Sequence, residues 1–285
     1  MTRYSTSAPQ RLVGWCLRDY RESAGYELAE AARILDCHRT KISRIETGQR
    51  GIHPKELREL LAEYGADPAV VEALAALARP HRHGDGWWTE YASVLPDPYL
   101  EFAAAETTAT AIMTYAPVQV PELLQTPAYA SAAAIADASV PEEWEAAVAA
   151  TVLARQRATL DERRTRLDVV LSEAALHQQT GDTAVLSTQL RHLVELAGHR
   201  RHVTIRLLPF ASRLSPAGGT GGFSVLRFGP AVAFGLAYVA GPDGGLFPTD
   251  PHAAIGYLRA FDHLAALALS PEATTRRLHE LAGNH

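Results

Sequence analysis

One short stretch of the chain groups cationic and hydroxyl side chains that could contact nucleic acid. In order, its residues of interest are Arg39, Thr40, Lys41, Ser43, Arg44 and Arg50. An Arg side chain can donate two hydrogen bonds to O6 and N7 of guanine, whereas Lys and Ser more often bind phosphate oxygens. These residue types are typical of a surface that contacts a DNA duplex.

The spacing of apolar residues predicts that two short helices position this stretch. Apolar residues recur at helical spacing over residues 27–35, and a polar break at residues 36–38 is too short to be a flexible loop. A second helix is predicted over residues 39–47, with Gly48 as its C-terminal stop. The pattern indicates a bent helix pair.

The same spacing predicts how the pair is held. Leu35, Ile42 and Ile45 form the predicted motif core, which leaves the cationic side chains on the outer face. A helix over residues 11–23 and an apolar face downstream supply the rest of a small core. The downstream residues are Leu57, Leu60, Leu61 and Tyr64.

These residues resemble a known family of DNA-binding domains. The residues that carry the resemblance are Gly25, Leu35, Arg39, Ile42, Ser43, Ile45, Glu46 and Gly48. They are similar to the Cro/cI-type (XRE-family) helix-turn-helix, whose ISRIE-G run matches residues 42–48. The resemblance implies that Arg39, Thr40 and Arg44 read base edges, with Lys41 and Ser43 beside the phosphate backbone. At the start of the second helix, His38 stands where the family often has Ser.

The charge of the chain is unevenly distributed. The formal net charge of the 285 residues is −5, yet residues 1–83 hold 13 Lys and Arg against 11 Asp and Glu, which leaves −7 for the remainder. Residues 33–58 hold seven cations and three acids. Because the positive charge is modest and lies on the motif, specific, salt-sensitive DNA binding is a better interpretation than bulk attraction.

Cysteine content and hydropathy bear on the compartment. The two cysteines, Cys16 and Cys37, fall at predicted core or turn positions, and a buried thiol behaves as a small apolar group. A reducing cytoplasm is the simplest setting for them. The chain has no uninterrupted apolar run of about 18 residues. We therefore expect a cytoplasmic protein without membrane association.

The length of the chain allows two domains, each with its own core. Residues 79–88 combine Pro, Gly and charge and mark a boundary between a DNA-binding domain over residues 1–80 and a larger domain over residues 81–285. In the larger domain, Arg155 is one of several cations near the C-terminal end of the long helix predicted over residues 141–164, where positive charge suits the helix dipole. Helices in the larger domain are predicted over residues 99–115, 122–124, 127–138, 141–164, 173–178, 183–197, 252–269 and 271–282.

Strand patterns complete the predicted fold. They lie at residues 167–171, 203–208, 223–228 and 232–239, and Gly229-Pro230 favours a hairpin between the last two. The predicted fold class is α+β: an N-terminal all-α helix-turn-helix domain followed by a larger mixed domain with a helical part and a small, mainly antiparallel sheet.

The larger domain also resembles a family. Residues 114–130, 171–176, 203–210 and 244–247 are similar to the C-terminal domain of unknown function in actinobacterial WhiJ-like regulators. This resemblance implies a transcriptional regulator that often works with a small acidic partner protein.

Other chemistry finds weaker support. His81 and His83 lie near Asp85, and His199 and His202 bracket two arginines, but both sets are incomplete as metal sites. No G-x-S-x-G elbow or other nucleophile motif is present. We expect neither a metal, nor a cofactor, nor enzymatic activity.

Three hypotheses about function remain open. The first is a transcriptional regulator that binds a double-stranded DNA operator as a homodimer, with Arg39, Thr40 and Arg44 on the bases and Lys41, Ser43 and Arg50 on the backbone. The second is a protein-interaction module of antitoxin type. The third is a sensor of a small-molecule effector, with a pocket lined by strand aromatics, although such residues are more often core. These aromatics are Phe223, Phe228, Phe234 and Tyr238.

Overall fold

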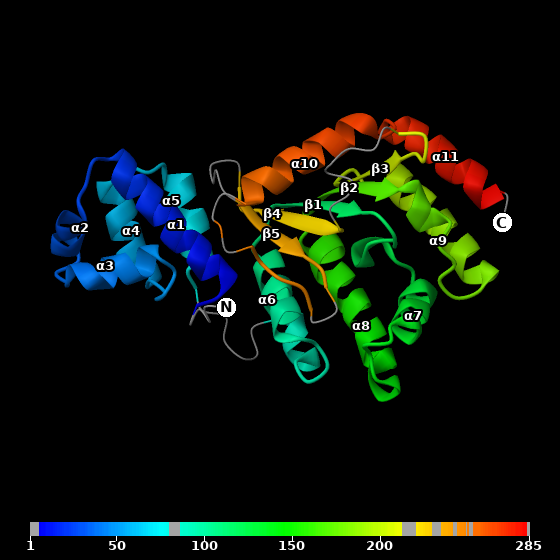
Figure 1. Ribbon diagram of the computed structural model, residues 1–285, viewed down its shortest axis with the longest axis horizontal. Helices are drawn as coiled ribbons and strands as arrows, with labels where there is room; N and C mark the ends of the chain where they lie inside the picture. The colour runs from blue at the N-terminus through cyan, green and yellow to red at the C-terminus, as the bar shows by residue number, and fades with distance from the viewer. Residues whose placement is uncertain are drawn as a thin grey trace.

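The computed structural model describes residues 6–79, 86–212, 221–229, 235–241, 244–248, 250 and 253–283. A bundle of helices from the N-terminal part of the chain lies beside a larger part that is built on a sheet (Figure 1). The domain boundary predicted at residues 80 and 81 lies outside the described residues, so its position stays a prediction.

Five helices form the N-terminal bundle: α1 (Ala8–Ser23), α2 (Leu28–Ile34), α3 (Arg39–Glu46), α4 (Pro54–Glu63) and α5 (Pro68–Leu77). Most of them begin at a residue that suits a helix N-terminus. Ser7, His38, His53 and Asp67 each accept a hydrogen bond from a backbone N–H of the first turn. The apolar faces of these helices enclose one core that contains Leu12, Leu17, Ile42, Leu57 and Leu60.

A five-stranded sheet forms the centre of the larger part, in the order β3-β2-β1-β4-β5. Its strands are β1 (Ala111–Ala116), β2 (Arg166–Ser172), β3 (Val203–Leu208), β4 (Phe223–Arg227) and β5 (Gly235–Val239). The pairs β1-β2 and β2-β3 are parallel, whereas β1-β4 and β4-β5 are antiparallel. The α+β class is confirmed, but the sheet is mixed rather than mainly antiparallel.

The sequence predicts a helix over residues 99–115, and this prediction is wrong for the second half of that range. Helix α6 (Asp97–Glu106) ends where Thr107 and Thr108 follow, and their hydroxyls donate to the carbonyls of Ala104 and Ala105. β1 then begins at Ala111 and forms the central strand. Threonine-rich sequence favours extended backbone, and pairing on both sides stabilises it there. Because β1 is the shared partner of β2 and β4, overlooking it also hid the parallel half of the sheet.

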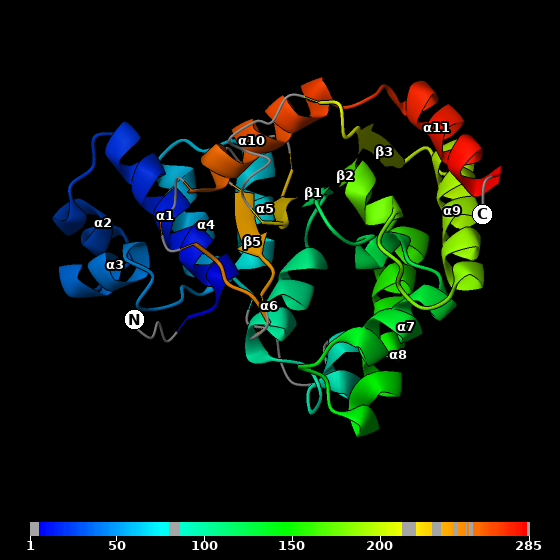
Figure 2. The same ribbon diagram turned by 45° about the vertical axis from the view of Figure 1, so that its right-hand side comes forward.

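Helices cover both faces of the sheet and one of its edges (Figures 1 and 2). The remaining long helices are α7 (Pro127–Ala136), α8 (Glu145–Gln156), α9 (Thr183–His199), α10 (Ala253–Leu267) and α11 (Pro271–Gly283). α10 lies on one face, where Phe261 packs with Val170 and Phe223, and α6 and α8 lie on the other side. At the edge, Leu207 of β3 donates its N–H to Thr274 of α11, so this helix covers the side of β3 that has no strand partner.

The two parts of the chain meet at α1. This helix contacts α6 and β5, and the backbone N–H of Ala8 donates a hydrogen bond to the carboxylate of Glu101 on α6. Buried apolar residues of the N-terminal bundle and of the sheet belong to one continuous cluster. α1 is therefore the structural link between the bundle and the sheet.

Within the described part of the chain, no helix is long and apolar enough to cross a lipid bilayer. Both cysteines are unpaired, with Cys16 buried and Cys37 half-buried. Burial raises the pKa of the Cys16 thiol to about 12, so that side chain acts as an apolar core group, as its position in the sequence predicts.

The crossing of α1 over α3 generates a first prediction. A Cβ placed on Gly14 would lie 2.1 Å from the backbone oxygen of Ile45, so Gly14→Ala should force the two helices apart. We expect a loss of about 1–3 kcal/mol in the free energy of unfolding, measured by urea denaturation followed by circular dichroism. Gly256→Ala on α10 is the matched control, because no atom lies within 4 Å of its added Cβ, and it should leave stability equal or higher. Equal stabilities for the two variants would contradict the close crossing.

Candidate nucleic-acid interface

α3 is a short helix whose two ends are fixed by particular residues. At its start, Nδ1 of His38 accepts the backbone N–H of Thr40 at 3.3 Å and lies 2.7 Å from Oγ1 of the same residue. At its end, Gly48 has a φ of +69°, in the left-handed region that favours glycine, and its N–H donates to Ile45. The helix therefore spans almost the predicted range, and His38 takes the capping role.

One side of α3 is buried in the bundle. The side chains of Ile42 and Ile45 are buried, with 0% and 1% of their surface exposed, and Leu35 is half-buried against the same cluster. Successive residues of an α-helix turn by about 100°, so these two isoleucines determine which side of α3 faces outward. This packing agrees with the predicted motif core.

The opposite side of α3 presents polar and cationic side chains to solvent. Arg39, Thr40 and Arg44 are exposed, and Ser43 lies between them, half-buried. Arg50 is exposed in the turn after the helix, where its N–H donates to the carbonyl of Arg44 at 3.0 Å. The structure therefore brings the three predicted base-reading residues and Arg50 to one exposed region.

Lys41 differs from its neighbours. Its side chain points toward α4, and Nζ lies 2.5 Å from Oε1 of Glu56 in a half-buried ion pair. A contact from Lys41 to phosphate would require this pair to open, which costs on the order of 1 kcal/mol for a partly exposed pair. Sequence spacing alone placed Lys41 on the outer face, because Glu56 lies on the next helix.

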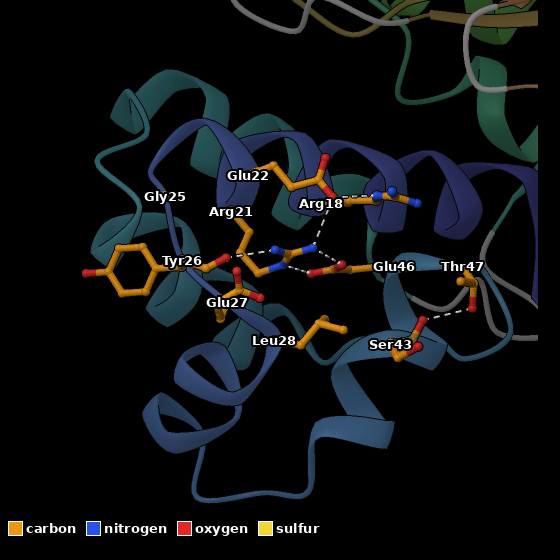
Figure 3. A pocket seen from close by; sticks show the side chains of 10 residues that line it. All are labelled: Arg18, Arg21, Glu22, Gly25, Tyr26, Glu27, Leu28, Ser43, Glu46 and Thr47. Atoms are coloured by element: carbon orange, nitrogen blue, oxygen red, sulfur yellow. Dashed lines mark hydrogen bonds and ion pairs between the residues drawn. The ribbon is translucent and has the colours of Figure 1, made fainter.

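A buried ion pair between α1 and α3 was not predicted. The guanidinium of Arg21 donates two hydrogen bonds to the carboxylate of Glu46, from Nε at 2.7 Å and from Nη2 at 2.8 Å. Its Nη1 donates to the carbonyl of Tyr26, in the segment before α2 (Figure 3). The hydrogen bonds to Glu46 raise the pKa of Arg21, which stays charged. One signal was available: Arg21 follows Leu17 by four residues and shares the apolar face of α1.

A hollow of about 460 Å³ lies beside this pair, bounded by α1, α3 and the start of α2 (Figure 3). Glu22 and Glu27 line it, and Glu22 accepts a hydrogen bond from Arg18 at 2.8 Å. Its lining holds three carboxylates against the guanidiniums of Arg18 and Arg21, so the hollow does not extend the cationic surface. The exposed side of α3 is the better candidate for a DNA contact.

The metal sites considered in the sequence gain no support. The described residues contain no group of three His, Cys, Asp or Glu side chains that could hold a metal ion. Ring nitrogens of His199 and His202 are each 3.1 Å from a backbone carbonyl oxygen. The cluster at His81, His83 and Asp85 lies outside the described residues.

The helix pair α2 and α3 has the arrangement of a helix-turn-helix DNA-binding domain, and comparison with protein families agrees. A model described as a helix-turn-helix domain matches residues 12–74. A second model, described as a domain of unknown function (DUF5753), matches residues 99–280, and the chain belongs to the family that this domain defines. Neither the curated proteins nor the solved structures contain a match to the chain.

The buried ion pair generates a second prediction. Glu46→Leu leaves the buried Arg21 guanidinium with only the exposed carboxylate of Glu22, 3.3 Å from its Nη2, and we expect the free energy of unfolding to fall by about 3–5 kcal/mol in urea denaturation. The double variant Arg21→Met with Glu46→Leu should recover most of this loss, because it leaves no charge behind. Arg18→Gln is the control, since it removes an exposed pair with Glu22 and should cost about 1 kcal/mol or less. If Glu46→Leu is as stable as Arg18→Gln, the pair does not hold α3.

Proposed function

We propose that this protein is a sequence-specific transcriptional regulator that inserts α3 into the major groove of an operator. The observation that carries this proposal is the division of α3 into two sides, with Ile42, Ile45 and Glu46 buried and Arg39, Thr40 and Arg44 exposed. A major groove admits one α-helix, and a helix fixed on its inner side can present its outer residues to base edges.

The individual contacts follow the Cro/cI-type resemblance. Arg39, Thr40 and Arg44 read base edges, and Ser43 and Arg50 contact phosphate. Lys41 joins them only if its pair with Glu56 opens. His38 supports this assignment because it holds the hydroxyl of Thr40 near the start of the helix, the end that meets the bases in this mode of docking.

The DUF5753 domain receives a signal or pairs subunits in this proposal, and the protein acts as a regulator rather than as an enzyme. A single helix-turn-helix covers only a short half-site, so a homodimer supplies the contacts that give useful affinity. The WhiJ-like resemblance supports the same arrangement and adds a small acidic partner protein, which stays a prediction from that resemblance. A cavity in the DUF5753 domain, described below, favours small-molecule sensing as the form of the signal.

Selection of DNA from a randomised library by the full chain tests base reading. Arg39→Ala and Arg44→Ala should each lower the affinity for the selected sequence by about 1–3 kcal/mol and relax the preference at one base position. Arg50→Ala should instead weaken binding to all sequences. It should also lower the slope of log affinity against log salt concentration by about 1, the contribution of one phosphate contact. Fluorescence anisotropy over a salt series measures both effects.

The control for this series is Arg276→Ala, which removes the same charge from an exposed position on α11 and should leave binding within twofold of wild type. Two results would refute the assignment. Either the full chain selects no common sequence, or Arg39→Ala and Arg44→Ala bind the selected sequence as the control does.

Dimerisation makes a separate prediction about the selected DNA. If two copies bind together, the sequence should contain two inverted half-sites whose centres lie about 10 base pairs apart or a multiple of that spacing. The mass of the protein–DNA complex, measured by light scattering, should correspond to two chains. A single asymmetric site bound by one chain would argue against the dimer and leave base reading intact.

A further inference from the structure

A cavity of about 1040 Å³ lies in the DUF5753 domain, on the face of the sheet opposite α10. Leu167 and Val169 of β2 line it. Side chains alternate along a strand, so Val170 points to the other face of the sheet and packs against α10. α6, α8 and the loop of residues 117–121 form the other walls. This volume is at the upper end of the range for cavities that bind small organic molecules.

Aromatic rings form one wall of the cavity. Phe102 of α6 and Tyr238 of β5 are stacked with their ring centroids 4.2 Å apart, and Tyr99 adjoins Phe102 at 6.3 Å. At the mouth, Trp144 and Val118 expose 39% and 56% of their surface to solvent. Exposed apolar side chains at a cavity mouth favour a ligand with an apolar body. Of the aromatics that the sequence proposed for a pocket, Tyr238 and Phe223 border this cavity, Phe228 is core and Phe234 lies outside the described residues.

The one guanidinium among the described lining residues is already neutralised. Arg155 of α8 is buried rather than placed at a solvated helix end, and its Nη2 lies 2.5 Å from the Glu106 carboxylate. Its Nη1 lies 2.6 Å from Oε2 of Glu122, and its guanidinium carbon lies 4.9 Å from the ring centre of Phe102. An anionic ligand would have to displace a carboxylate from Arg155, and it would meet the remaining negative charge.

Negative charge is in excess around the cavity. Two carboxylates, Glu122 and Asp137, line it against the single guanidinium of Arg155, and Glu106 lies directly behind Arg155. Burial is the main reason that the pKa of the Tyr238 hydroxyl rises to about 12, and the charges of Glu122 and Arg155 act on it in opposite directions. Oε2 of Glu122 accepts hydrogen bonds from Arg155 and Tyr99, while within the described residues Oε1 has no protein donor. One carboxylate oxygen is therefore available to a ligand.

We propose that this cavity binds a small organic cation, with its ammonium group at Oε1 of Glu122 and its apolar body against Phe102, Tyr238 and Trp144. The Glu122 carboxylate supplies a charge-assisted acceptor on the cavity wall, and the aromatic side chains supply apolar surface for the body of the ligand. This site specifies how the proposed regulator receives a signal. Only the effect of the ligand on DNA binding rests on the proposed function.

The position of the cavity offers a route for that effect. Its aromatic wall comes from α6 and β5, and α1 of the N-terminal bundle contacts both of these elements. α1 also holds Glu46 of α3 through Arg21. A ligand that shifts Phe102 or Tyr238 would therefore act on packed elements that lead to the DNA-binding helix.

Binding of matched probes to the full chain, without DNA, tests the site. Isothermal titration calorimetry compares phenylpropylamine, phenylpropanol and phenylpropanoate, and then decylamine, decanol and decanoate, which share a body and differ in charge. We expect each amine to bind at least tenfold more tightly than its carboxylate. Glu122→Gln should remove this preference, whereas Glu195→Gln on the exposed side of α9 should keep it.

Trp144→Ala keeps the test decisive if Glu122→Gln fails to fold, because Trp144 is partly exposed and its loss should weaken amine and alcohol alike. Three results would overturn the proposal: no probe binds, a carboxylate binds as tightly as its amine, or a folded Glu122→Gln keeps the preference. Because the assay contains no DNA, amine binding by a protein that selects no DNA sequence would refute the proposed function alone. DNA selection without amine binding would refute this inference alone.

Discussion

The buried pair of Arg21 and Glu46 determines how α3 is presented. An eight-residue helix is too short to be stable by itself, so its position depends on what holds it. Burial of the two isoleucines determines which side of α3 faces the core but not the exact orientation of the helix. The two hydrogen bonds from one guanidinium fix the distance between Arg21 and Glu46 and make the two groups coplanar. The same guanidinium binds the carbonyl of Tyr26, so α1, α3 and the start of α2 are joined at a single point. Such a pair contributes more to geometry than to net stability.

Much of the site was readable from the sequence because its determinants are local. The apolar positions Ile42 and Ile45, the cap at His38 and the glycine at position 48 lie within a dozen residues, and each acts through its nearest neighbours. The partners of Arg21 and Lys41 were not readable, because Glu46 and Glu56 lie 25 and 15 residues away in the sequence. Periodicity indicates which face a residue occupies and not which side chain faces it across a helix crossing.

The same limit explains which features of the larger part of the chain the sequence did not predict. β2 to β5 were predicted because their runs are apolar and β-branched. The central strand β1 follows the alanine-rich α6 after only residues 107–110, which contain no Gly or Pro to mark a turn. The parallel pairing also depends on crossovers through helices, which a strand pattern does not reveal. Arg155 was taken for a solvated helix-end cation because Glu106, its partner, is 49 residues away.

Two buried arginines thus organise the two parts of the chain in different ways. Arg21 occupies both carboxylate oxygens of its partner Glu46, whereas Arg155 binds one carboxylate oxygen of Glu122 at the wall of an open cavity. α1 connects them, because one end of it bonds to α6 through Ala8 and the other end carries Arg21. A sixteen-residue helix transmits displacement as a stiff rod of about 24 Å. Movement of the cavity wall would therefore reach α3 as a tilt of the whole helix.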